Sequence, residues 1–179
     1  MNFKPFSFHP QINAGISKVG YTIPTQIQSR AIPPILAGSD VLGLAQTGTG
    51  KTAAFVLPML QHLMKSPRGK LRALILAPTR ELAEQTHVAI KELGGQTGLR
   101  SISIYGGVSA NPQKNRLRNG VDIVVACPGR LLDLKNQGAI DLRNIEILVL
   151  DEADHMFDMG FLPDIKRIIS ALPQKRQTL

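Results

Sequence analysis

The chain has 179 residues, the length of one ordinary domain and enough to bury a substantial hydrophobic core. Hydrophobic residues make up 43% of the chain and charged residues 19%, which excludes a disordered or fibrous protein. The single cysteine, Cys127, cannot form an internal disulfide, so a disulfide-stapled secreted scaffold is excluded and a reducing cytoplasm is favoured. Lys and Arg number 21 against 13 Asp and Glu, and this net charge of +8 favours a polyanionic partner. The apolar runs are too short to span a membrane, and no signal-peptide pattern opens the chain.

Short aliphatic runs alternate with longer amphipathic stretches. In chain order, the predicted elements are helices at 11–18 and 25–37, a strand at 41–44, a helix at 51–64, a strand at 73–77, a helix at 80–93, a strand at 101–105, a helix at 112–118, a strand at 122–126, a helix at 131–136 and a strand at 146–150. The strand candidates lack polar alternation, which is typical of strands covered on both faces. The pattern therefore predicts an α/β fold, with a mostly parallel sheet and helices on both faces. Right-handed connections then place the loops that follow the strands at one edge, where ligands bind.

The segment after the first predicted strand has the composition of a phosphate-binding loop. It consists of Ala45, Gln46, Thr47, Gly48, Thr49, Gly50, Lys51 and Thr52, with Ala45 where such loops usually begin with glycine. Gly48 and Gly50 allow backbone N–H groups to converge on an anion, and the following helix adds the positive end of its dipole. Lys51 is predicted to reach the β- and γ-phosphates of a nucleotide, and Thr52 to ligate Mg²⁺. The alternative is an ordinary strand-to-helix turn with a capping threonine.

The last predicted strand ends in the acidic sequence Asp151, Glu152, Ala153, Asp154. Carboxylates at the end of a buried strand are costly unless a cation or a hydrogen-bond donor meets them. Asp151 is therefore predicted to bind Mg²⁺, through a coordinated water, and Glu152 to orient or deprotonate the water that attacks the γ-phosphate. The alternative is an acidic opening of the next helix, with Asp154 as its cap.

Taken together, these two motifs resemble the amino-terminal RecA-like domain of the bacterial type of DEAD-box ATP-dependent RNA helicases. Residues 20–28 are similar to the adenine-recognition motif of that family, so Tyr21 and Gln28 are predicted to contact the nucleotide. The Gln28 amide carries a donor and an acceptor that match adenine N6 and N7, which would select ATP over GTP. Phe3 lies 17 residues before Gly20, where the family places an aromatic residue against the base. Without the resemblance, Gln28 would be a surface residue of a helix and Phe3 a minor core residue.

Three further segments are similar to the family's RNA-binding motifs and lie after predicted strands. They are Pro78, Thr79 and Arg80; Gly106 and Gly107; and Pro128, Gly129 and Arg130. Free N–H groups at helix starts, hydroxyls and glycines suit sugar and phosphate groups, so contacts to the backbone of single-stranded RNA are implied, without base specificity. The alternative is that these turns are structural. Cys127 stands where the family usually has threonine, and His155 where a basic residue is common.

The resemblance extends from Phe3 to Leu179 and implies one domain over residues 1–179, in which residues 1–28 recognise adenine. The second RecA-like domain of such helicases, expected as a partner, is absent, as is the Ser-Ala-Thr strand to which Asp154 would couple. We therefore expect a monomer that binds ATP or ADP with Mg²⁺, hydrolyses ATP barely and does not unwind RNA, whereas the full protein would separate short duplexes. The segment after Leu172 is expected to fray.

Two other functions are compatible with the motifs. One is a different P-loop ATPase, such as a DNA helicase, and the other is a non-enzymatic domain that clamps RNA or a protein. The sequence around Cys127 and the four histidines has no spacing typical of a zinc site. Four further residues are predicted to lie in the core or to pack helices, namely Met156, Phe157, Met159 and Phe161.

Overall fold

Five short strands form one parallel sheet in the computed structural model, which describes residues 2–46 and 48–179. The strands are β1 (Ala73–Leu76), β2 (Ser101–Ile104), β3 (Ile123–Ala126), β4 (Ile147–Leu150) and β5 (Gln177–Thr178), in the order β2-β3-β1-β4-β5. Every neighbouring pair is parallel, and β1 lies between β3 and β4. The carboxyl ends of the strands therefore meet at one edge, and the amino ends meet at the opposite edge.

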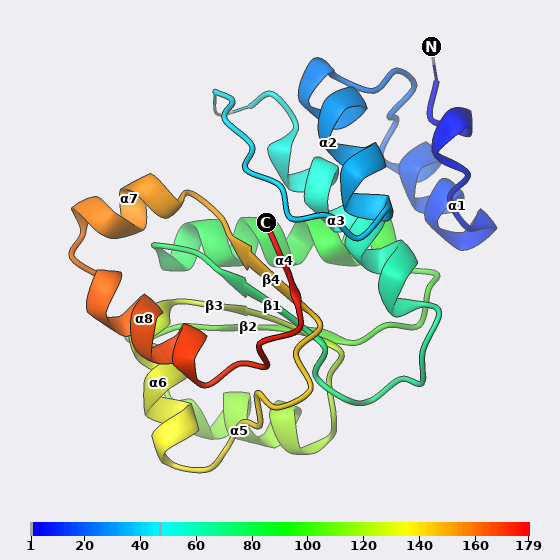
Figure 1. The fold of residues 1–179 in the computed structure, drawn as a ribbon. Helices are drawn as coiled ribbons and strands as arrows, with labels where there is room; N and C mark the ends of the chain where they lie inside the picture. Colours follow the sequence, from blue (N-terminus) through cyan, green and yellow to red (C-terminus); the bar gives the residue numbers. More distant parts are fainter. Residues whose placement is uncertain (1, 47) are drawn as a thin grey trace.

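Helices cover both faces of this sheet (Figure 1). One face is covered by α3 (Lys51–Leu63) and α4 (Arg80–Gly94), and α1 (Pro10–Lys18) and α2 (Gln26–Leu36) pack on the outer side of these two helices. The other face is covered by α5 (Ala110–Arg118), α6 (Pro128–Asn136), α7 (Ala153–Asp158) and α8 (Leu162–Ser170). A short 3₁₀ turn, Lys4–Phe6, precedes α1. Side chains of β1 alternate between two cores, since Ile75 joins the first and Leu74 the second. This arrangement confirms the predicted α/β class.

Within three residues at each boundary, the six predicted helices and four of the five predicted strands form. The predicted strand at 41–44 is wrong, because the segment runs as irregular chain. The Val41 N–H donates to the Thr178 carbonyl (3.2 Å), but Leu42 and Leu44 are 88% and 86% exposed. The reason is that β5 has only two residues, which offer too few backbone groups to pair with a strand of four residues.

Two residues that were predicted to lie in the core or to pack helices are exposed instead. Met156 is buried, as predicted, and Phe161 is half-buried, but Phe157 and Met159 are 46% and 47% exposed. The physical reason is that α7 has six residues, so one face of it packs on the sheet and the opposite side chains face outward. No helix in the described ranges has both the length and the apolar character needed to cross a membrane.

The amino edge of the sheet is organised by one buried carboxylate. Asp122 is fully buried, and its two carboxylate oxygens accept hydrogen bonds from the backbone N–H groups of Gly69 (2.7 Å) and Arg100 (2.8 Å). The guanidinium of Arg72, also buried, lies 3.8 Å from the same carboxylate and donates to the Leu63 carbonyl (2.8 Å). Asp122 thus joins three loops that precede neighbouring strands.

We predict that Asp122→Asn lowers the free energy of unfolding by about 3–5 kcal/mol, because it leaves a buried guanidinium without its counter-charge. Chemical denaturation measures this loss. The matched control is Asp141→Asn, whose partner Arg143 is 85% exposed and which we expect to cost less than about 1 kcal/mol. Equal effects of the two substitutions would contradict the role given to Asp122.

Candidate functional site

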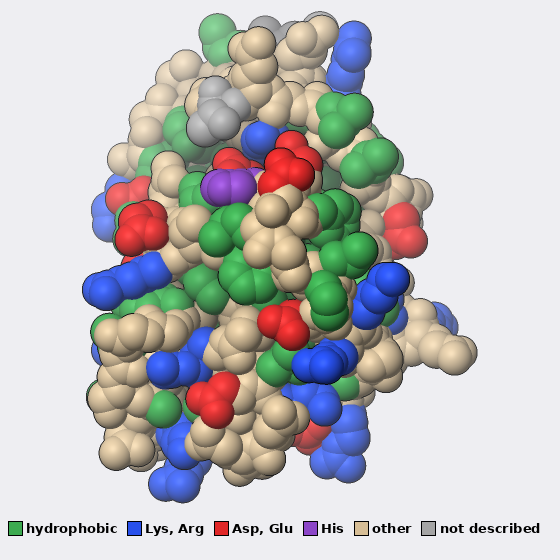
Figure 2. Space-filling view, turned by 90° about the vertical axis from the view of Figure 1, so that its left-hand side faces the viewer, with side chains coloured by type: hydrophobic (Ala, Val, Ile, Leu, Met, Phe, Trp, Pro, Cys, Tyr) green, Lys and Arg blue, Asp and Glu red, His purple; other side chains and the backbone are tan. Residues whose placement is uncertain are grey.

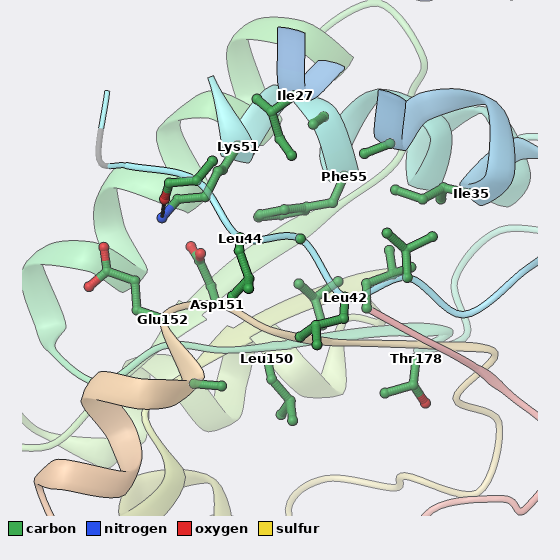
Figure 3. Close-up of a pocket in the computed structure, with 18 of the residues that line it drawn as sticks. Ile27, Ile35, Leu42, Leu44, Lys51, Phe55, Leu150, Asp151, Glu152 and Thr178 are labelled. Carbon is green, nitrogen blue, oxygen red and sulfur yellow. Dashed lines mark hydrogen bonds between the residues drawn. The ribbon is translucent and has the colours of Figure 1, made fainter. Parts of the chain in front are cut away.

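A cavity of about 770 Å³ opens at the carboxyl edge of the sheet, between α2, α3, β4 and the segment 41–45. Lys51, Asp151, Glu152 and Asp154 all line it, although Lys51 is distant from the acidic residues in sequence. Figure 3 shows Lys51, Asp151 and Glu152 gathered at one end, while hydrophobic side chains such as Ile35 occupy the other. The fold therefore brings the predicted phosphate-binding lysine and the predicted metal-binding carboxylate into one cavity.

The loop before α3 curls around the Lys51 side chain. Its ammonium group donates a hydrogen bond to the Ala45 carbonyl (2.7 Å), so it lies inside the loop. Gly48 and Gly50 adopt φ angles of 82° and 91°, a left-handed conformation that other residues rarely take. The Thr49 hydroxyl donates to the Gln46 carbonyl (2.7 Å) and closes the turn. This geometry is that of a concave loop whose backbone can face an anion.

Two threonines of the predicted loop flank its glycines. Thr52 lies in the first turn of α3 and is half-buried, beside Lys51. Thr47, which was predicted to contact the nucleotide, lies outside the described residues.

Gln28 is buried, with 3% of its surface exposed, rather than lying on the helix surface. Its side-chain carbonyl accepts from the Thr25 N–H (3.0 Å), and its amide nitrogen donates to the Gly50 carbonyl (3.2 Å). With the Thr25 hydroxyl accepting from the Gln28 N–H, this forms a capping box that starts α2. Gln28 thus ties α2 to the predicted phosphate-binding loop, a link that the sequence motif did not reveal.

The two aromatic residues of the predicted adenine site lie one behind the other. The rings of Phe3 and Tyr21 are stacked, with centroids 6.4 Å apart and planes inclined by 16°. Phe3 is 6% exposed and also contacts Phe6 edge-on, whereas Tyr21 is 42% exposed. Tyr21 therefore presents the outer ring, and Phe3 supports it from the core.

Asp151 follows β4 directly and forms hydrogen bonds with β1 and α4. Its N–H donates to the Leu76 carbonyl (2.9 Å), and its carboxylate accepts a long hydrogen bond from the Thr86 hydroxyl (3.4 Å). Burial raises the pKa of Asp151 above its ordinary value, and the negative charge of Glu152 raises it further, while Lys51 and Thr86 act in the opposite direction. The protein alone therefore leaves this carboxylate incompletely compensated.

Glu152 adopts a left-handed backbone conformation, with a φ of 52°, immediately before α7. Such a conformation is costly for a residue with a Cβ atom, and it turns the chain sharply from strand to helix. The His155 ring nitrogen Nδ1 lies 3.5 Å from the Glu152 carboxylate, and Asp154 is exposed nearby. Figure 2 shows the molecule from the carboxyl edge of the sheet, where acidic side chains gather beside a histidine.

The three predicted RNA-binding segments follow β1, β2 and β3, which are neighbours in the sheet. The Thr79 hydroxyl caps α4 by accepting from the Leu82 N–H (3.3 Å). Arg80 is exposed, and its guanidinium lies 4.8 Å from the centre of the Tyr105 ring, a contact that steadies a cation. Tyr105 was not among the predicted site residues, although it directly precedes the predicted Gly106 and Gly107.

Arg130 faces its own protein rather than open solvent. It donates to the Val108 carbonyl (2.9 Å), and its Nε lies 3.6 Å from the Asp133 carboxylate. Gly106, Gly107 and Gly129 are exposed, and Gly107 has a φ of 75°, whereas Pro128 is buried at the start of α6. Arg130 thus holds the loop of Gly106 and Gly107 in place.

Cys127 precedes α6 but makes no side-chain cap to it. Burial raises the pKa of its thiol to about 11, so the group is neutral at ordinary pH. Cys127 therefore provides neither a side-chain cap for α6 nor a charged thiolate at this position.

The chain matches the family model described as DEAD/DEAH box helicase over residues 25–179. It is similar to the ATP-dependent RNA helicase dbp10 of Schizosaccharomyces pombe, with 48% identity over 99% of this chain and 21% of that protein. The DEAD-box ATP-dependent RNA helicase CshA of Streptococcus pneumoniae is 47% identical over 100% of this chain and 34% of its own length.

Solved structures agree with these matches. A DEAD box protein from Methanococcus jannaschii superposes with a TM-score of 0.94 and 38% identity, over 100% of this chain and 49% of that one. A hypothetical ATP-dependent RNA helicase from Sulfolobus tokodaii gives a TM-score of 0.88 and 41% identity, over 96% of this chain and 49% of that one. This chain thus spans less than half the length of each of these four relatives. The sheet order, the cavity shared by Lys51 and Asp151, and these matches together show that the chain belongs to the DEAD/DEAH box helicase family.

Proposed function

We propose that this chain is the ATP-binding RecA-like domain of an RNA-dependent ATPase that acts in the cytoplasm. The observation that carries the proposal is that Lys51, Asp151 and Glu152 line one cavity beside a concave loop. A lysine that reaches phosphates, a carboxylate that binds metal and a second carboxylate that handles water are the groups that ATP hydrolysis requires. In the full protein, this hydrolysis would drive the separation of short RNA duplexes.

The phosphates of ATP or ADP would lie in the concave loop. Lys51 now donates to the Ala45 carbonyl, and on binding it would exchange this acceptor for β- and γ-phosphate oxygens. Backbone N–H groups of the loop would supply further donors, including those of Gln46, Gly48, Thr49 and Gly50. The base would lie against Tyr21, whose ring is supported by Phe3, with Gln28 at its edge.

The donor set at this site fits Mg²⁺. The described residues contain no group of three or more His, Cys, Asp or Glu side chains that could hold a metal by themselves. Mg²⁺ typically uses one or two carboxylates together with substrate phosphates and waters, and Asp151 and the Thr52 hydroxyl match that requirement. A bound divalent cation would supply the positive charge that the Asp151 carboxylate needs as a partner, and it would also neutralise the phosphates. Glu152 would orient the attacking water and accept its proton.

RNA would bind at the loops that follow β1, β2 and β3. Arg80 and Thr79 and the exposed glycines offer a cation, a hydroxyl and close backbone approach to sugars and phosphates, all independent of base sequence. Arg130, which is bonded to Val108, would act mainly by fixing this surface.

The full reaction is proposed to need a second RecA-like domain. An arginine supplied from a partner domain contributes about 10³–10⁵-fold in rate in related phosphoryl-transfer enzymes. We therefore propose that the 179-residue chain is a monomer that binds nucleotide, hydrolyses it barely and does not unwind RNA. Asp154, exposed at the cavity rim, would couple to that second half of the machinery.

The roles of the two charged groups can be separated by substitution. We predict that Lys51→Ala abolishes binding of Mg-ATP, because the phosphates lose their only cation from this loop. Glu152→Gln should keep the ATP affinity of this chain within about twofold. In the full protein it should lower single-turnover hydrolysis by about 10²-fold or more, since it removes a general base. Titration calorimetry and a radiolabelled single-turnover assay measure the two quantities. Lys65→Ala is the control, and unchanged ATP binding by Lys51→Ala would refute the site.

Substitution of Gln28 tests the base preference. We predict that Gln28→Ala reduces the ratio of ATP to GTP affinity and also lowers the free energy of unfolding by about 1–3 kcal/mol, because Thr25 and Gly50 lose their buried partner. Competition binding and denaturation measure these effects. Gln26→Ala, in the same helix turn but exposed, should change neither. An unchanged ATP to GTP ratio would show that the base is selected elsewhere.

The raised pKa of Asp151 predicts how stability depends on pH without nucleotide and metal. Between its ordinary value of 3.8 and the raised value, the folded chain binds more protons than the unfolded chain, so stability falls as pH rises through that window. Asp151→Asn removes this loss, and its melting temperature should therefore exceed that of the wild type at pH 7, with the difference shrinking toward pH 4.

The control for this experiment is Asp141→Asn. The pKa of Asp141 is lowered by its hydrogen bonds to Arg143, so the sign is opposite, and this variant should be slightly less stable at pH 7. A melting temperature of Asp151→Asn below that of the wild type at pH 7 would contradict the picture of an uncompensated carboxylate.

A further inference from the structure

The amino edge of the sheet, opposite the nucleotide cavity, carries a cluster of exposed cations. Arg68, Lys70, Arg100, Arg143 and Lys175 come from the loops that precede β1, β2, β4 and β5, and each is exposed. We call these five residues the basic edge. In a parallel sheet, the loops before the strands all meet at this side, so residues far apart in sequence lie together here (Figure 1).

Contacts show that the basic edge is continuous. Lys70, Arg143 and Lys175 line one shallow cavity of about 500 Å³. The Arg100 guanidinium lies beside Gly69, since its Nη2 is 3.1 Å from the position that a Cβ atom would occupy there, and Arg68 packs against Gly98 in the same way. The loop that carries Arg68 and Lys70 therefore joins the cavity to Arg100.

Hydrogen bonds to a buried carboxylate fix the backbone of two loops that carry the basic edge. The buried Asp122 accepts hydrogen bonds from the backbone N–H groups of Gly69 and Arg100, so it sets the positions of the two loops. The Arg100 side chain also donates to the Asn119 carbonyl (2.7 Å). A cationic surface that is held in place loses less conformational entropy when it binds than flexible lysines on a helix would.

The carboxylates near this edge already have partners. Asp122 is paired with Arg72 and Asp141 with Arg143. The Glu146 carboxylate, which also lines the shallow cavity, lies 2.8 Å from the His62 ring nitrogen. Among the described residues, no carboxylate lies within 4.0 Å of the cationic groups of Arg68, Lys70 or Lys175. The positive potential of these three side chains is therefore directed at solvent.

We propose that the basic edge is a second contact surface for the RNA backbone, separate from the loops at the carboxyl edge. The proposal rests on the RNA binding proposed above. The four-residue strands alone separate the two edges by about 13 Å, so the second surface would hold a different stretch of the same RNA. Unpaired cations without an aromatic platform contact phosphates, and such binding is independent of sequence and sensitive to salt.

The test is a charge-reversal variant, Arg68→Glu/Lys70→Glu/Lys175→Glu, whose side chains are exposed and lie outside the nucleotide cavity. Fluorescence anisotropy would measure its affinity for single-stranded RNA of about 8 nucleotides, within the usual footprint of one single-strand site, and of about 30 nucleotides. We expect the affinity for the long RNA to fall about tenfold and the salt dependence of log K to lose about two units of slope. Affinities for the short RNA and for ATP should stay within about twofold.

The matched control is Lys18→Glu/Lys91→Glu/Lys166→Glu, which changes the net charge equally at exposed positions on α1, α4 and α8. An equal loss of long-RNA binding in both variants would overturn the proposal, since only diffuse charge would then matter. An equal loss for short and long RNA in the charge-reversal variant would overturn it too. If the wild-type chain binds neither RNA, the proposed function itself fails, which is a different result.

Vesicles of phosphatidylserine and phosphatidylcholine provide a further arm. We expect no vesicle binding that depends on the basic edge. Loss of vesicle binding by the charge-reversal variant, with long-RNA binding retained, would identify a membrane as the partner and contradict the proposal.

Discussion

The burial of the Asp151 carboxylate at the end of β4 is the constraint on which the proposed chemistry depends. Desolvation and the adjacent Glu152 both disfavour its charged form, and the nearby Lys51 and Thr86 compensate only in part. A buried charge in this condition reduces the stability of the folded chain. Under the proposed function, a cation and a phosphate that enter the cavity would compensate this charge. The cost that burial imposes on the free protein would then be recovered when the nucleotide binds.

A second buried carboxylate provides the contrast. Asp122 at the amino edge is more deeply buried than Asp151, yet its oxygens meet two backbone N–H groups and the Arg72 guanidinium lies nearby. Asp122 thus has hydrogen-bond donors and a cation as partners and fixes loops, whereas the charge of Asp151 is compensated only in part and faces a cavity. The difference lies in the partners and not in the depth of burial, and it separates a structural acid from a candidate catalytic one.

The sequence predicted most of this arrangement because its signals are local. Uninterrupted aliphatic runs such as 73–77 identified the buried strands, and Gly48 and Gly50 before Lys51 identified the loop. The strand predicted at 41–44 failed because strand formation depends on neighbours, and β5 offers too few of them. The exposed sides of α7 were missed for a related reason, since apolar composition does not say which face packs.

Long-range side-chain contacts were beyond local patterns altogether. Nothing in the sequence showed that the Gln28 amide donates to the Gly50 carbonyl or that the Arg80 guanidinium lies over the Tyr105 ring. The hydrogen bond from Arg130 to the Val108 carbonyl was equally hidden. The most direct test of the whole account is a crystal structure of this chain with Mg²⁺ and a non-hydrolysable ATP analogue. It should show the phosphates within the loop of residues 46–50, with Lys51 moved from the Ala45 carbonyl to a phosphate oxygen and the metal near Asp151. A nucleotide bound elsewhere, with Lys51 still on the Ala45 carbonyl, would contradict it.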